Sequence, residues 1–553
     1  MPPHHFAHWP PGVPHEPRLP EVSVYRNLEA STARHADKPL LYFYGTPLRY
    51  RRFAEEVDAL AGFLQRRCGV ARGDRVLLFL QNSPQFMIAY YACLRADAMV
   101  VPVNPMNLTE ELRHHAEDSG ARVIVAGQEV FAQARPLLGD ALDHAVVAAY
   151  SDYLTEPTDL RVPDVAAAPR QGVGGPGVVA WHEALAARLA PGPHTAGPAD
   201  RCVLPYTSGP TGKPKGCLHT HRGVMSTVVA GCAWVGLDAD AVVLSTLPLF
   251  HVTGMQHGMN QPIYAGATVV LTCRWDRETA ARLIERHRVT AWTNISTMAI
   301  DFLAEPTLDR YDLSSLRYIG GGGAAMPGAV ADRLFERTGL HYLEGYGLSE
   351  TMAPTHINPP HRPRRQCLGV PICHTESRVI DPQTLAELGP GEVGEIVSRG
   401  PQVFVGYWND PAATEAAFVT LGGRRFFRTG DLGYYDEDGY FFLVDRLKRM
   451  INASGFKVWP AEVEAVLYRH PAIREVCVIG TRDAHRGETV KAVVVLREDS
   501  RQTITAGAIR DWARAHMAAY KAPHVVEIVE SLPKSATGKV QWRLLQEIED
   551  RKA

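Results

Sequence analysis

The sequence predicts an α/β protein with a large N-terminal domain of parallel sheets and helices, a β-rich subdomain, and a small α+β domain at the C-terminus. Three observations predict this class. Apolar runs alternate with amphipathic stretches from residue 25 to 126, and the alternation returns between residues 242 and 337. Beyond residue 381 the runs shorten and turn residues become frequent, and beyond residue 446 helices and strands mix. We therefore expect two domains, residues 1–445 and residues 446–553.

Short apolar runs bounded by turn residues mark the predicted strands of the first domain. Helical patterns separate several of them, and strands joined through helices pair in parallel. The predicted strands cover residues 76–80, 99–103, 202–205, 242–247, 268–272, 290–294 and 316–319. The predicted helices cover residues 277–287 and 328–337, and another begins near Thr220. Residues 156–198 are rich in proline, glycine and alanine, which predicts a long connection or an insertion.

The C-terminal domain is predicted as a compact α+β unit. Pro460 opens a predicted helix that runs to about Arg469, because proline is accepted at the first helical position. A second predicted helix covers residues 508–519. The predicted strands cover residues 475–479, 490–496 and 524–529.

The composition favours a globular protein that acts on small molecules. The chain has 553 residues, of which 46% are hydrophobic and 21% charged, and its formal net charge is −2. Because no run of lysine or arginine dominates, we expect no nucleic-acid partner. The N-terminus lacks the order of a signal peptide, and no run is long enough to span a membrane, so we expect a cytoplasmic protein. The oligomeric state stays open, with a homodimer as one alternative.

The cysteines and the first residues carry no predicted site. The nine cysteines contain no CxxC pair and are expected to be buried thiols rather than disulfides or metal ligands. The early histidines, His4 and His5, are expected in a solvated, flexible tail rather than in a metal site.

Residues 206–216, with the sequence YTSGPTGKPKG, predict a loop that holds a polyphosphate. A strand-like run precedes this loop and a helix follows it, so backbone N–H groups could face an anion while Lys215 supplies charge. The loop is not a Walker motif, because only two residues separate Gly209 from Gly212 and a proline follows Lys213. A mobile surface turn is the alternative interpretation.

Four further segments add groups that an ATP-dependent enzyme needs. The run from Ile319 to Ala325 has four glycines, which would let a flat ring lie against the backbone. Residues 344–351, with the sequence EGYGLSET, offer an aromatic face, a hydroxyl and a carboxylate that could hold magnesium. Residues 428–431 offer a carboxylate for ribose hydroxyls, and residues 533–539 place a lysine in a terminal loop.

These five segments, in this order, resemble the core motifs of the adenylate-forming superfamily of acyl-CoA synthetases, adenylation domains and luciferases. The resemblance covers about residues 25 to 545, and the style of the sequence is most like bacterial fatty acyl-CoA ligases. It implies a large N-terminal domain and a small C-terminal lid that rotates between two half-reactions. A carboxylate attacks the α-phosphate of ATP to give an acyl-adenylate and pyrophosphate, and coenzyme A then displaces AMP.

The resemblance also implies roles for particular residues. The expected catalytic residues are Lys539, Glu350, Ser349, Lys215 and His251, and the expected magnesium ligands are Thr207 and Glu350. The expected nucleotide- and cofactor-binding residues are Thr207, Ser208, Gly209, Thr211, Gly212, Lys215, Gly323, Ala324, Glu344, Gly345, Tyr346, Gly347, Ser349, Asp431, Arg446, Lys448, Gly455 and Lys539. Among these, Lys539 is the adenylation lysine, Lys448 the hinge of the lid, and Gly455 lines a tunnel for pantetheine. Pro210 departs from the pattern, because a hydroxyl residue is usual there.

The acid is predicted less sharply than the reaction. Residues 247–254, which include His251, match the segment near the acyl pocket, and no aspartate is present there to hold an amino acid's amine. Trp292, Asn294 and Met298 could form another wall, or they could belong to a buried core strand. A medium- or long-chain fatty acid is the first expectation, and an aryl or short branched acid is the second. A luciferase-like oxygenase and a non-catalytic nucleotide-binding protein are the alternatives from other classes.

Overall fold

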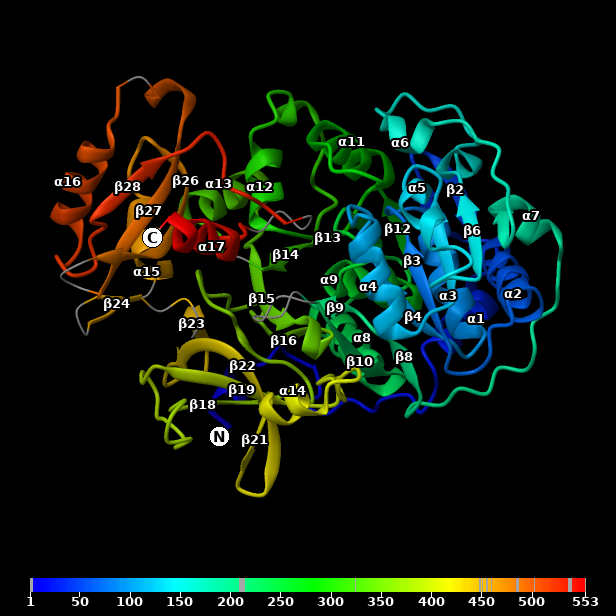
Figure 1. Ribbon diagram of the computed structural model, residues 1–553, viewed down its shortest axis with the longest axis horizontal. Helices are drawn as coiled ribbons and strands as arrows, with labels where there is room; N and C mark the ends of the chain where they lie inside the picture. The colour runs from blue at the N-terminus through cyan, green and yellow to red at the C-terminus, as the bar shows by residue number, and fades with distance from the viewer. Residues whose placement is uncertain are drawn as a thin grey trace. The chain divides into compact units, whose positions relative to one another are not determined.

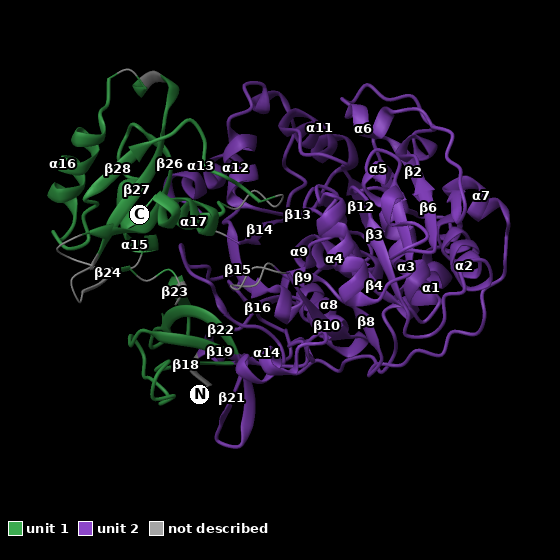
Figure 2. Cartoon of the chain, viewed as in Figure 1, with its two compact units in different colours: residues 1, 377–397, 428–553 green, residues 2–376, 398–427 purple. Residues whose placement is uncertain are grey.

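The computed structural model describes residues 3–207, 214–323, 325–446, 449, 451–453, 456–458, 460–483, 487–501, 503–535 and 540–552. Figure 2 shows the chain divided into two compact units. Unit 2 holds residues 2–376 and 398–427, and unit 1 holds residues 377–397 and 428–553. The division at residue 427 falls inside strand β22 (Arg424–Tyr435). The predicted domain boundary at residue 445 lies within unit 1 and stays a prediction.

The first sheet of unit 2 has a parallel centre and antiparallel ends. Figure 1 labels its strands β2, β12, β13, β14, β15 and β16. Its strand order is β17-β16-β15-β14-β13-β11-β12-β1-β2. The parallel strands are β1 (Pro39–Phe43), β11 (Val242–Ser245), β12 (Thr268–Leu271), β13 (Ala291–Asn294), β14 (Tyr318–Gly322) and β15 (Leu343–Leu348). The antiparallel strands at the ends are β2 (Thr46–Arg49), β16 (Ala353–Ile357) and β17 (Val370–Pro371).

The second sheet of unit 2 has the strand order β20-β10-β8-β4-β3-β5-β6-β7, with β9 paired to β10. Its parallel strands are β3 (Arg75–Phe79), β4 (Met99–Pro102), β5 (Val123–Gly127), β6 (His144–Ala148), β7 (Val178–Ala180) and β8 (Arg201–Val203). Its antiparallel strands are β9 (Tyr206–Thr207), β10 (Lys215–Thr220) and β20 (Gly406–Tyr407). Strand β7 lies in the segment predicted as a long connection, so that segment also extends the sheet.

The core of unit 2 follows the alternation of side chains along its strands. On β3, Val76 and Leu78 pack in the cluster that includes Leu41 and Val269 of the first sheet, whereas Leu77 and Phe79 pack in a second cluster. Both faces of this parallel sheet are therefore covered, as its apolar strands require. The first cluster is built on the helices α1 (Tyr25–His35), α2 (Tyr50–Arg66), α3 (Pro84–Arg95), α8 (His221–Val235) and α10 (Gln261–Ala265), and the second on α4 (Thr109–Ser119) and α5 (Phe131–Ala134).

The N-terminal segment differs from the expected flexible tail. Residues Pro3–His8 form the short helix η1, and the side chains of His5, His8 and Trp9 are buried. The Trp9 ring packs edge-on against Trp234 of α8, with ring centroids 4.7 Å apart. The segment is held on unit 2 because the first nine residues contain five aromatic or imidazole rings, which supply enough apolar surface for packing.

Unit 1 combines part of a β-rich sheet with an α+β fold. The first part contains β18 (Glu376–Ile380), β19 (Gly394–Arg399), the second half of β22, and β23 (Phe441–Arg446). The second part is a sheet of order β25-β24-β27-β26, with β28 paired to β27. Its strands are β24 (Ile451–Ala453), β25 (Phe456–Val458), β26 (Ile473–Asp483), β27 (Gly487–Leu496) and β28 (Val525–Ile528). The helices α15 (Pro460–Leu467) and α16 (Ala506–His516) pack with one hydrophobic cluster, and α17 (Trp542–Lys552) packs with another.

Two further observations bear on the sequence predictions. All nine cysteines lie in the described part of the chain as free thiols, and eight of them are buried as expected, whereas Cys68 is partly exposed. Among the described residues, no helix has both the length and the apolar character needed to cross a bilayer.

Candidate active site

Strand β10 carries the cation that follows the predicted phosphate loop. Lys215, the first residue of β10, lies opposite Thr207 of β9. The other edge of β10 pairs with β20, where Cys217 lies opposite Tyr407. Residues 208–213, which include Ser208, Gly209, Thr211 and Gly212, lie outside the described residues. The structure therefore places the two ends of the loop on one antiparallel ribbon of unit 2.

Lys215 has two partners, Tyr407 on β20 and Asp410 on the segment that follows it. Its Nζ lies 2.9 Å from Asp410 Oδ2, and it stands over the ring of Tyr407, 5.4 Å from the ring centroid. Hydrogen bonding from Lys215 lowers the pKa of the Asp410 carboxyl. Asp410 also caps helix α14 (Pro411–Ala416), because its Oδ1 accepts a hydrogen bond from the N–H of Ala413 at 2.9 Å. Lys215 is thus held by a carboxylate whose own position is fixed.

Glu350, the expected magnesium ligand, is held by the same strand. It lies with Ser349 in the short helix η6 (Ser349–Thr351), and it is buried. The hydroxyl of Tyr407 donates to Glu350 Oε1 at 2.9 Å, and the N–H of Phe404 donates to the Glu350 carbonyl at 2.7 Å. Burial and the Glu350 charge raise the pKa of Tyr407, so the phenol stays a neutral donor. Both Lys215 and Glu350 therefore contact the side chain of Tyr407.

His219 supports the turn that carries Ser349. It is a fully enclosed residue of β10, and its Nε2 lies 2.7 Å from the Ser349 carbonyl oxygen. Since a carbonyl can only accept, Nε2 carries the proton and donates it. Burial lowers the pKa of His219 to about 4, so the imidazole is neutral at physiological pH. The turn that holds Ser349 and Glu350 is therefore tied to β10 through His219 and to β20 and the residues before it through Tyr407 and Phe404.

The glycine run has a structural reason that differs from the one expected. A Cβ on Gly320, Gly321 or Gly322 would lie closer than 3.0 Å to a backbone oxygen of the neighbouring strand β15 or β13. Gly323 has a φ of +88°, a region that side chains rarely adopt. Ala324 lies outside the described residues. Close strand packing requires these glycines whether or not a ring lies on them, and their predicted contact with adenine stays a prediction.

Glu344 joins three segments around the glycine run. Its carboxylate accepts from the N–H of Met326 at 2.5 Å and from the N–H of Cys367 at 2.8 Å. Burial raises the pKa of Glu344 to about 7, while the N–H donors lower it. The carboxylate faces the backbone of its own unit, which is the geometry of a structural support.

The rest of β15 carries the expected aromatic surface. Tyr346 is half-buried, and its ring centroid lies 5.7 Å from that of His356 on β16. A Cβ on Gly347 would lie closer than 3.0 Å to the Ala353 backbone, whereas one on Gly345 would meet nothing within that distance. Gly347 is therefore required by strand pairing.

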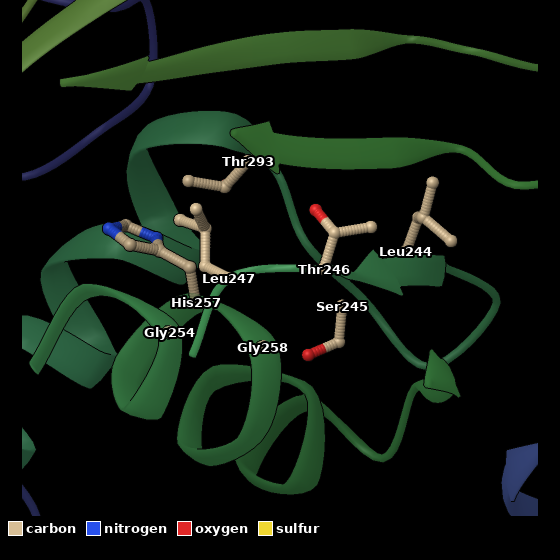
Figure 3. A pocket seen from close by; sticks show the side chains of 8 residues that line it. All are labelled: Leu244, Ser245, Thr246, Leu247, Gly254, His257, Gly258 and Thr293. Atoms are coloured by element: carbon tan, nitrogen blue, oxygen red, sulfur yellow. The ribbon is translucent and has the colours of Figure 1, made fainter. Parts of the chain in front are cut away.

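A small pocket lies between β11 and β13, where the strand order of the first sheet reverses. Strand β11 leads through helical turns to β12 on one side, whereas β13 leads through helix α12 (Ser296–Leu303) to β14 on the other. Open α/β sheets bind ligands at the carboxyl ends of such strands. The pocket at this point is lined by Leu244, Ser245, Thr246, Leu247, Gly254, His257, Gly258 and Thr293, and Figure 3 shows its helical and strand-end walls.

The predicted acid-binding segment lies beside this pocket. Leu247 and Gly254 belong to the segment and line the pocket, and His251 caps the short helix α9 (Val252–Met255) by accepting from the N–H of Thr253 at 3.3 Å. Trp292 is fully buried and stacks on Trp275, with centroids 5.7 Å apart, so it belongs to the core. Its neighbour Thr293 faces the pocket, because successive strand residues point to opposite faces.

Unit 1 carries the residues predicted to hold ribose. Asp431 of β22 lies opposite Arg446 of β23, and Asp431 is 2% exposed. Nearby, Arg428 pairs with Glu395 at 2.6 Å, which fixes the start of this turn. The structure brings Asp431 and Arg446 together by strand register. Lys448, Gly455 and Lys539 lie outside the described residues, and their predicted roles stay predictions.

A Ser-His-Asp arrangement elsewhere in unit 2 carries no catalytic argument. Ser23 Oγ lies 2.6 Å from His194 Nε2, and His194 Nδ1 lies 2.6 Å from Asp97 Oδ1. Ser23 is 0% exposed, so no substrate can reach its hydroxyl. Asp97 also accepts from the N–H of Thr195 at 2.9 Å, and the group ties the loop around His194 to the body of the unit.

Comparison with known proteins agrees with this arrangement. The model of the AMP-binding enzyme family matches residues 28–408, and that of the AMP-binding enzyme C-terminal domain matches residues 462–539. The chain belongs to the AMP-binding enzyme family. A long-chain-fatty-acid–CoA ligase of Bacillus subtilis (strain 168) is 35% identical over 98% of this chain and 97% of the relative. A feruloyl-CoA synthase of Amycolatopsis sp is 35% identical over 90% of this chain and 93% of the relative.

Solved structures confirm the predicted fold class. An anthranilate CoA ligase in complex with anthranoyl-AMP has a TM-score of 0.83 and 26% identity, covering 96% of this chain and 98% of the ligase. ATP-bound MatB from Rhodopseudomonas palustris also has a TM-score of 0.83, with 25% identity over 96% of this chain and 99% of MatB. This member of the AMP-binding enzyme family is an AMP-forming acid–thiol ligase, and ATP, Mg²⁺ and coenzyme A serve this enzyme class.

The described residues of this AMP-binding enzyme fit a magnesium ion that arrives with ATP. In the part of the chain that the structure describes, no three histidine, cysteine or acidic side chains gather into a metal cage. Mg²⁺ is commonly bound through one or two carboxylates plus substrate phosphates, so a single oriented carboxylate is sufficient. Glu350 would supply that carboxylate, and Thr207 ends its strand beside Lys215.

Sequence reasoning missed three residues of this site, namely Tyr407, Asp410 and His219. The sequence offered only one sign of Tyr407, a glycine before an aromatic residue. Its partner Glu350 lies 57 residues earlier in the chain, and nothing in either local pattern connects the two.

Proposed function

We propose that the chain activates a medium- or long-chain fatty acid with ATP and transfers the acyl group to coenzyme A, giving acyl-CoA, AMP and pyrophosphate. The observation that carries the proposal is the convergence of Lys215 and Glu350 on Tyr407, beside the strand that follows the phosphate loop. The names of the fatty-acid ligase relatives support the choice of acid.

The proposed chemistry has an electrostatic requirement. A carboxylate and ATP repel one another, so their reaction needs positive charge where negative charge grows. Lys215 provides one such charge on the phosphate side, and Glu350 would hold Mg²⁺, which would neutralise phosphate charge when bound. Ser349 would hold the α-phosphate through its hydroxyl, and Lys539 would bridge the two reactants. Removal of one such charge costs about 3 kcal/mol of transition-state stabilisation, roughly a hundredfold in rate.

The acid is proposed to lie toward the pocket at the carboxyl ends of β11 and β13. This position would leave the carboxylate near His251 and near the glycine run at the end of β14.

One observation favours the second candidate, an aryl or short branched acid. Ser245, Thr246, His257 and Thr293 make part of the pocket wall polar, and a hydrocarbon tail gains nothing from polar groups.

The first test is a panel of carboxylic acids assayed for pyrophosphate release, with saturated acids of increasing length beside benzoate, cinnamate and short branched acids. We expect the highest kcat/KM for a saturated acid of medium or long chain. An optimum for an aryl or branched acid would instead select the second candidate. Light emission with a luciferin would identify the oxygenase alternative, and absence of pyrophosphate release with every acid would contradict an enzyme of this type.

A second test separates the half-reactions. We expect Lys539→Ala to abolish acyl-adenylate formation and to leave thioester formation from supplied acyl-adenylate largely intact, because the lysine acts only in the first step. The measurements are pyrophosphate release and acyl-CoA formation by the same preparations. Equal loss of both would contradict the role of Lys539.

The cellular location and the oligomeric state are proposed as follows. We propose a cytoplasmic location, since nine free thiols suit a reducing compartment. A homodimer stays an alternative to a monomer, and light scattering on the purified chain distinguishes them.

A further inference from the structure

We infer that Tyr407 is a positioning residue that sets the orientation of the Glu350 carboxylate and the place of the Lys215 ammonium with one rigid side chain. The inference rests on the proposed function, because that function gives Glu350 its metal and Lys215 its polyphosphate. Tyr407 itself would touch neither nucleotide nor metal. Its hydroxyl contacts Glu350 and its ring contacts Lys215, and these two groups of opposite charge would touch the metal and the nucleotide.

The hydroxyl end of Tyr407 fixes the carboxylate. A carboxylate on a side chain with several rotatable bonds has many orientations, and the phenolic donor at 2.9 Å from Oε1 selects among them. The backbone of the same residue is fixed as well, because the N–H of Phe404 donates to the Glu350 carbonyl.

The ring face of Tyr407 contacts the Lys215 ammonium. The Lys215 ammonium stands 5.4 Å from the ring centroid, within the range in which a cation is attracted by the ring face. Asp410 holds the same ammonium at 2.9 Å. The phosphate-binding cation and the metal-binding carboxylate are thereby kept at a constant separation, since a tyrosine ring cannot change its length.

The backbone around Tyr407 is itself locked. Its N–H donates to Thr414 Oγ1 of helix α14 at 2.9 Å, and its ring packs edge-on against Phe404, with centroids 4.8 Å apart. A Cβ on the preceding residue, Gly406, would lie closer than 3.0 Å to the Thr414 side chain, so a glycine is needed for this approach. Pairing of β20 with β10 then sets Tyr407 in register with Cys217.

The test compares Tyr407→Phe with the parent enzyme. The variant loses only the hydroxyl and keeps the ring under Lys215. We expect Mn²⁺ to bind about tenfold more weakly, a size typical for groups that orient a metal ligand, in the presence of the ATP analogue with a methylene between the α- and β-phosphates, the link that this reaction cleaves. The readout is electron paramagnetic resonance of free Mn²⁺. Binding of the metal-free analogue should be unchanged, and kcat should recover at saturating Mg²⁺.

Two comparisons make the result specific. Tyr435→Phe is the matched control, because Tyr435 also donates its hydroxyl, to the Leu388 carbonyl at 3.2 Å, but lies in unit 1. It should leave Mn²⁺ binding unchanged. Tyr407→Leu removes the ring too and should additionally weaken binding of the metal-free analogue, since Lys215 loses its support. Circular dichroism and a melting curve establish that each variant is folded.

Glu350→Gln distinguishes failure of this inference from failure of the proposed function. If Glu350→Gln loses Mn²⁺ affinity while folded Tyr407→Phe keeps the parent value, Tyr407 does not position the carboxylate and only the inference is overturned. If both variants bind Mn²⁺ as the parent does, Glu350 is not the metal ligand, and the proposed role of Glu350 falls together with the inference.

Discussion

Strand β14 has no side chain at three successive positions, Gly320, Gly321 and Gly322. The surrounding strands occupy the space. The sequence alone suggested a surface for a flat ring, because ligand contact and strand packing both require glycine. The coordinates separate the two reasons for Gly321. Its missing Cβ would overlap the Asn294 backbone of β13, which belongs to the sheet.

Gly321→Ala should therefore destabilise unit 2 even without nucleotide. We expect a loss of about 3 kcal/mol or more, since backbone oxygen cannot move aside without separating two strands. The control is Gly328→Ala, at the start of helix α13 (Gly328–Thr338), where a Cβ would meet nothing within 4 Å. Thermal unfolding of both variants, with and without ATP, provides the measurement. Parent-like melting of Gly321→Ala combined with weak ATP binding would show that the glycine serves the nucleotide instead.

The candidate site could be predicted where chemistry dictates residue type and order. Lys215, Glu350 and Asp431 carry charges that the proposed reaction would use, so their motifs were recognisable in the sequence. His219 and Tyr407 could not be found in this way. Each acts through a hydrogen bond to a residue far away in the chain, and such a bond exists only after the strands have paired.

At the scale of elements, Arg449 joins the two sides of the predicted hinge at Lys448. It lies within 2.5 Å of Glu464 on α15 and 3.7 Å of Asp445 on β23, and it donates to the Val478 carbonyl of β26. All three charged side chains are largely buried, with 12%, 16% and 2% of their surfaces exposed. Asp445 also accepts from the N–H of Ala461 at the start of α15.

Arg449→Met should loosen this part of unit 1. Removal of one partner from a buried ion pair costs about 3 to 5 kcal/mol, because the remaining charges lose their compensation. We expect faster amide hydrogen exchange in α15 and β26, measured by mass spectrometry. Arg474→Met is the control, since the Arg474 side chain is 42% exposed and its pair with Glu475 contributes little. Unchanged exchange in α15 would mean that the cluster does not hold the helix.

Predicted and observed elements agree best where a periodic pattern of hydrophobic residues is bounded by clear start and stop residues. Helix α11 covers Arg277–His287 as predicted, with Asp276 capping its first turn. Strand β14 begins later than predicted and continues into the glycines, because pairing with β13 and β15 extends it beyond its apolar residues. Strand β26 is longer than predicted for the same reason, since it pairs with β27 along its whole length. The short strand β7 was not predicted, because its few apolar residues do not distinguish it from the surrounding connection.

At the scale of the molecule, unit 2 encloses neutral histidines that should make it sensitive to acid. Burial lowers the pKa of His219, His221 and His257 to about 4 and that of His356 to about 3. Unfolding returns each imidazole to an ordinary pKa of about 6.5, where protons bind more readily. The stabilising contribution is thus complete above pH 6.5 and is lost as the pH falls toward 4.

We expect the melting temperature to drop steeply between pH 6.5 and 4. Each histidine contributes about 3 kcal/mol over this range, so two or three of them offset the usual net stability of a domain. Calorimetry across this range measures the effect. His219→Gln should flatten the profile, whereas His361→Gln, at an exposed position, should not. A melting temperature that is constant down to pH 4 would contradict the account.

The position of the unit division inside β22 has a consequence for synthesis on the ribosome. Residues 377–397, which include most of β18 and β19, are made before the last piece of unit 2 at residues 398–427, yet they belong to unit 1. Unit 2 is complete at residue 427, while β19 gains its neighbour β22 only with the residues that follow. At about 5 to 20 residues per second, the two early strands wait for some seconds as an isolated pair, which is marginally stable in water. A single cut after residue 427 leaves residues 377–397 of unit 1 attached to unit 2, so it cannot release unit 1 whole, and a nascent chain arrested there carries a finished unit 2 with an unpaired strand edge.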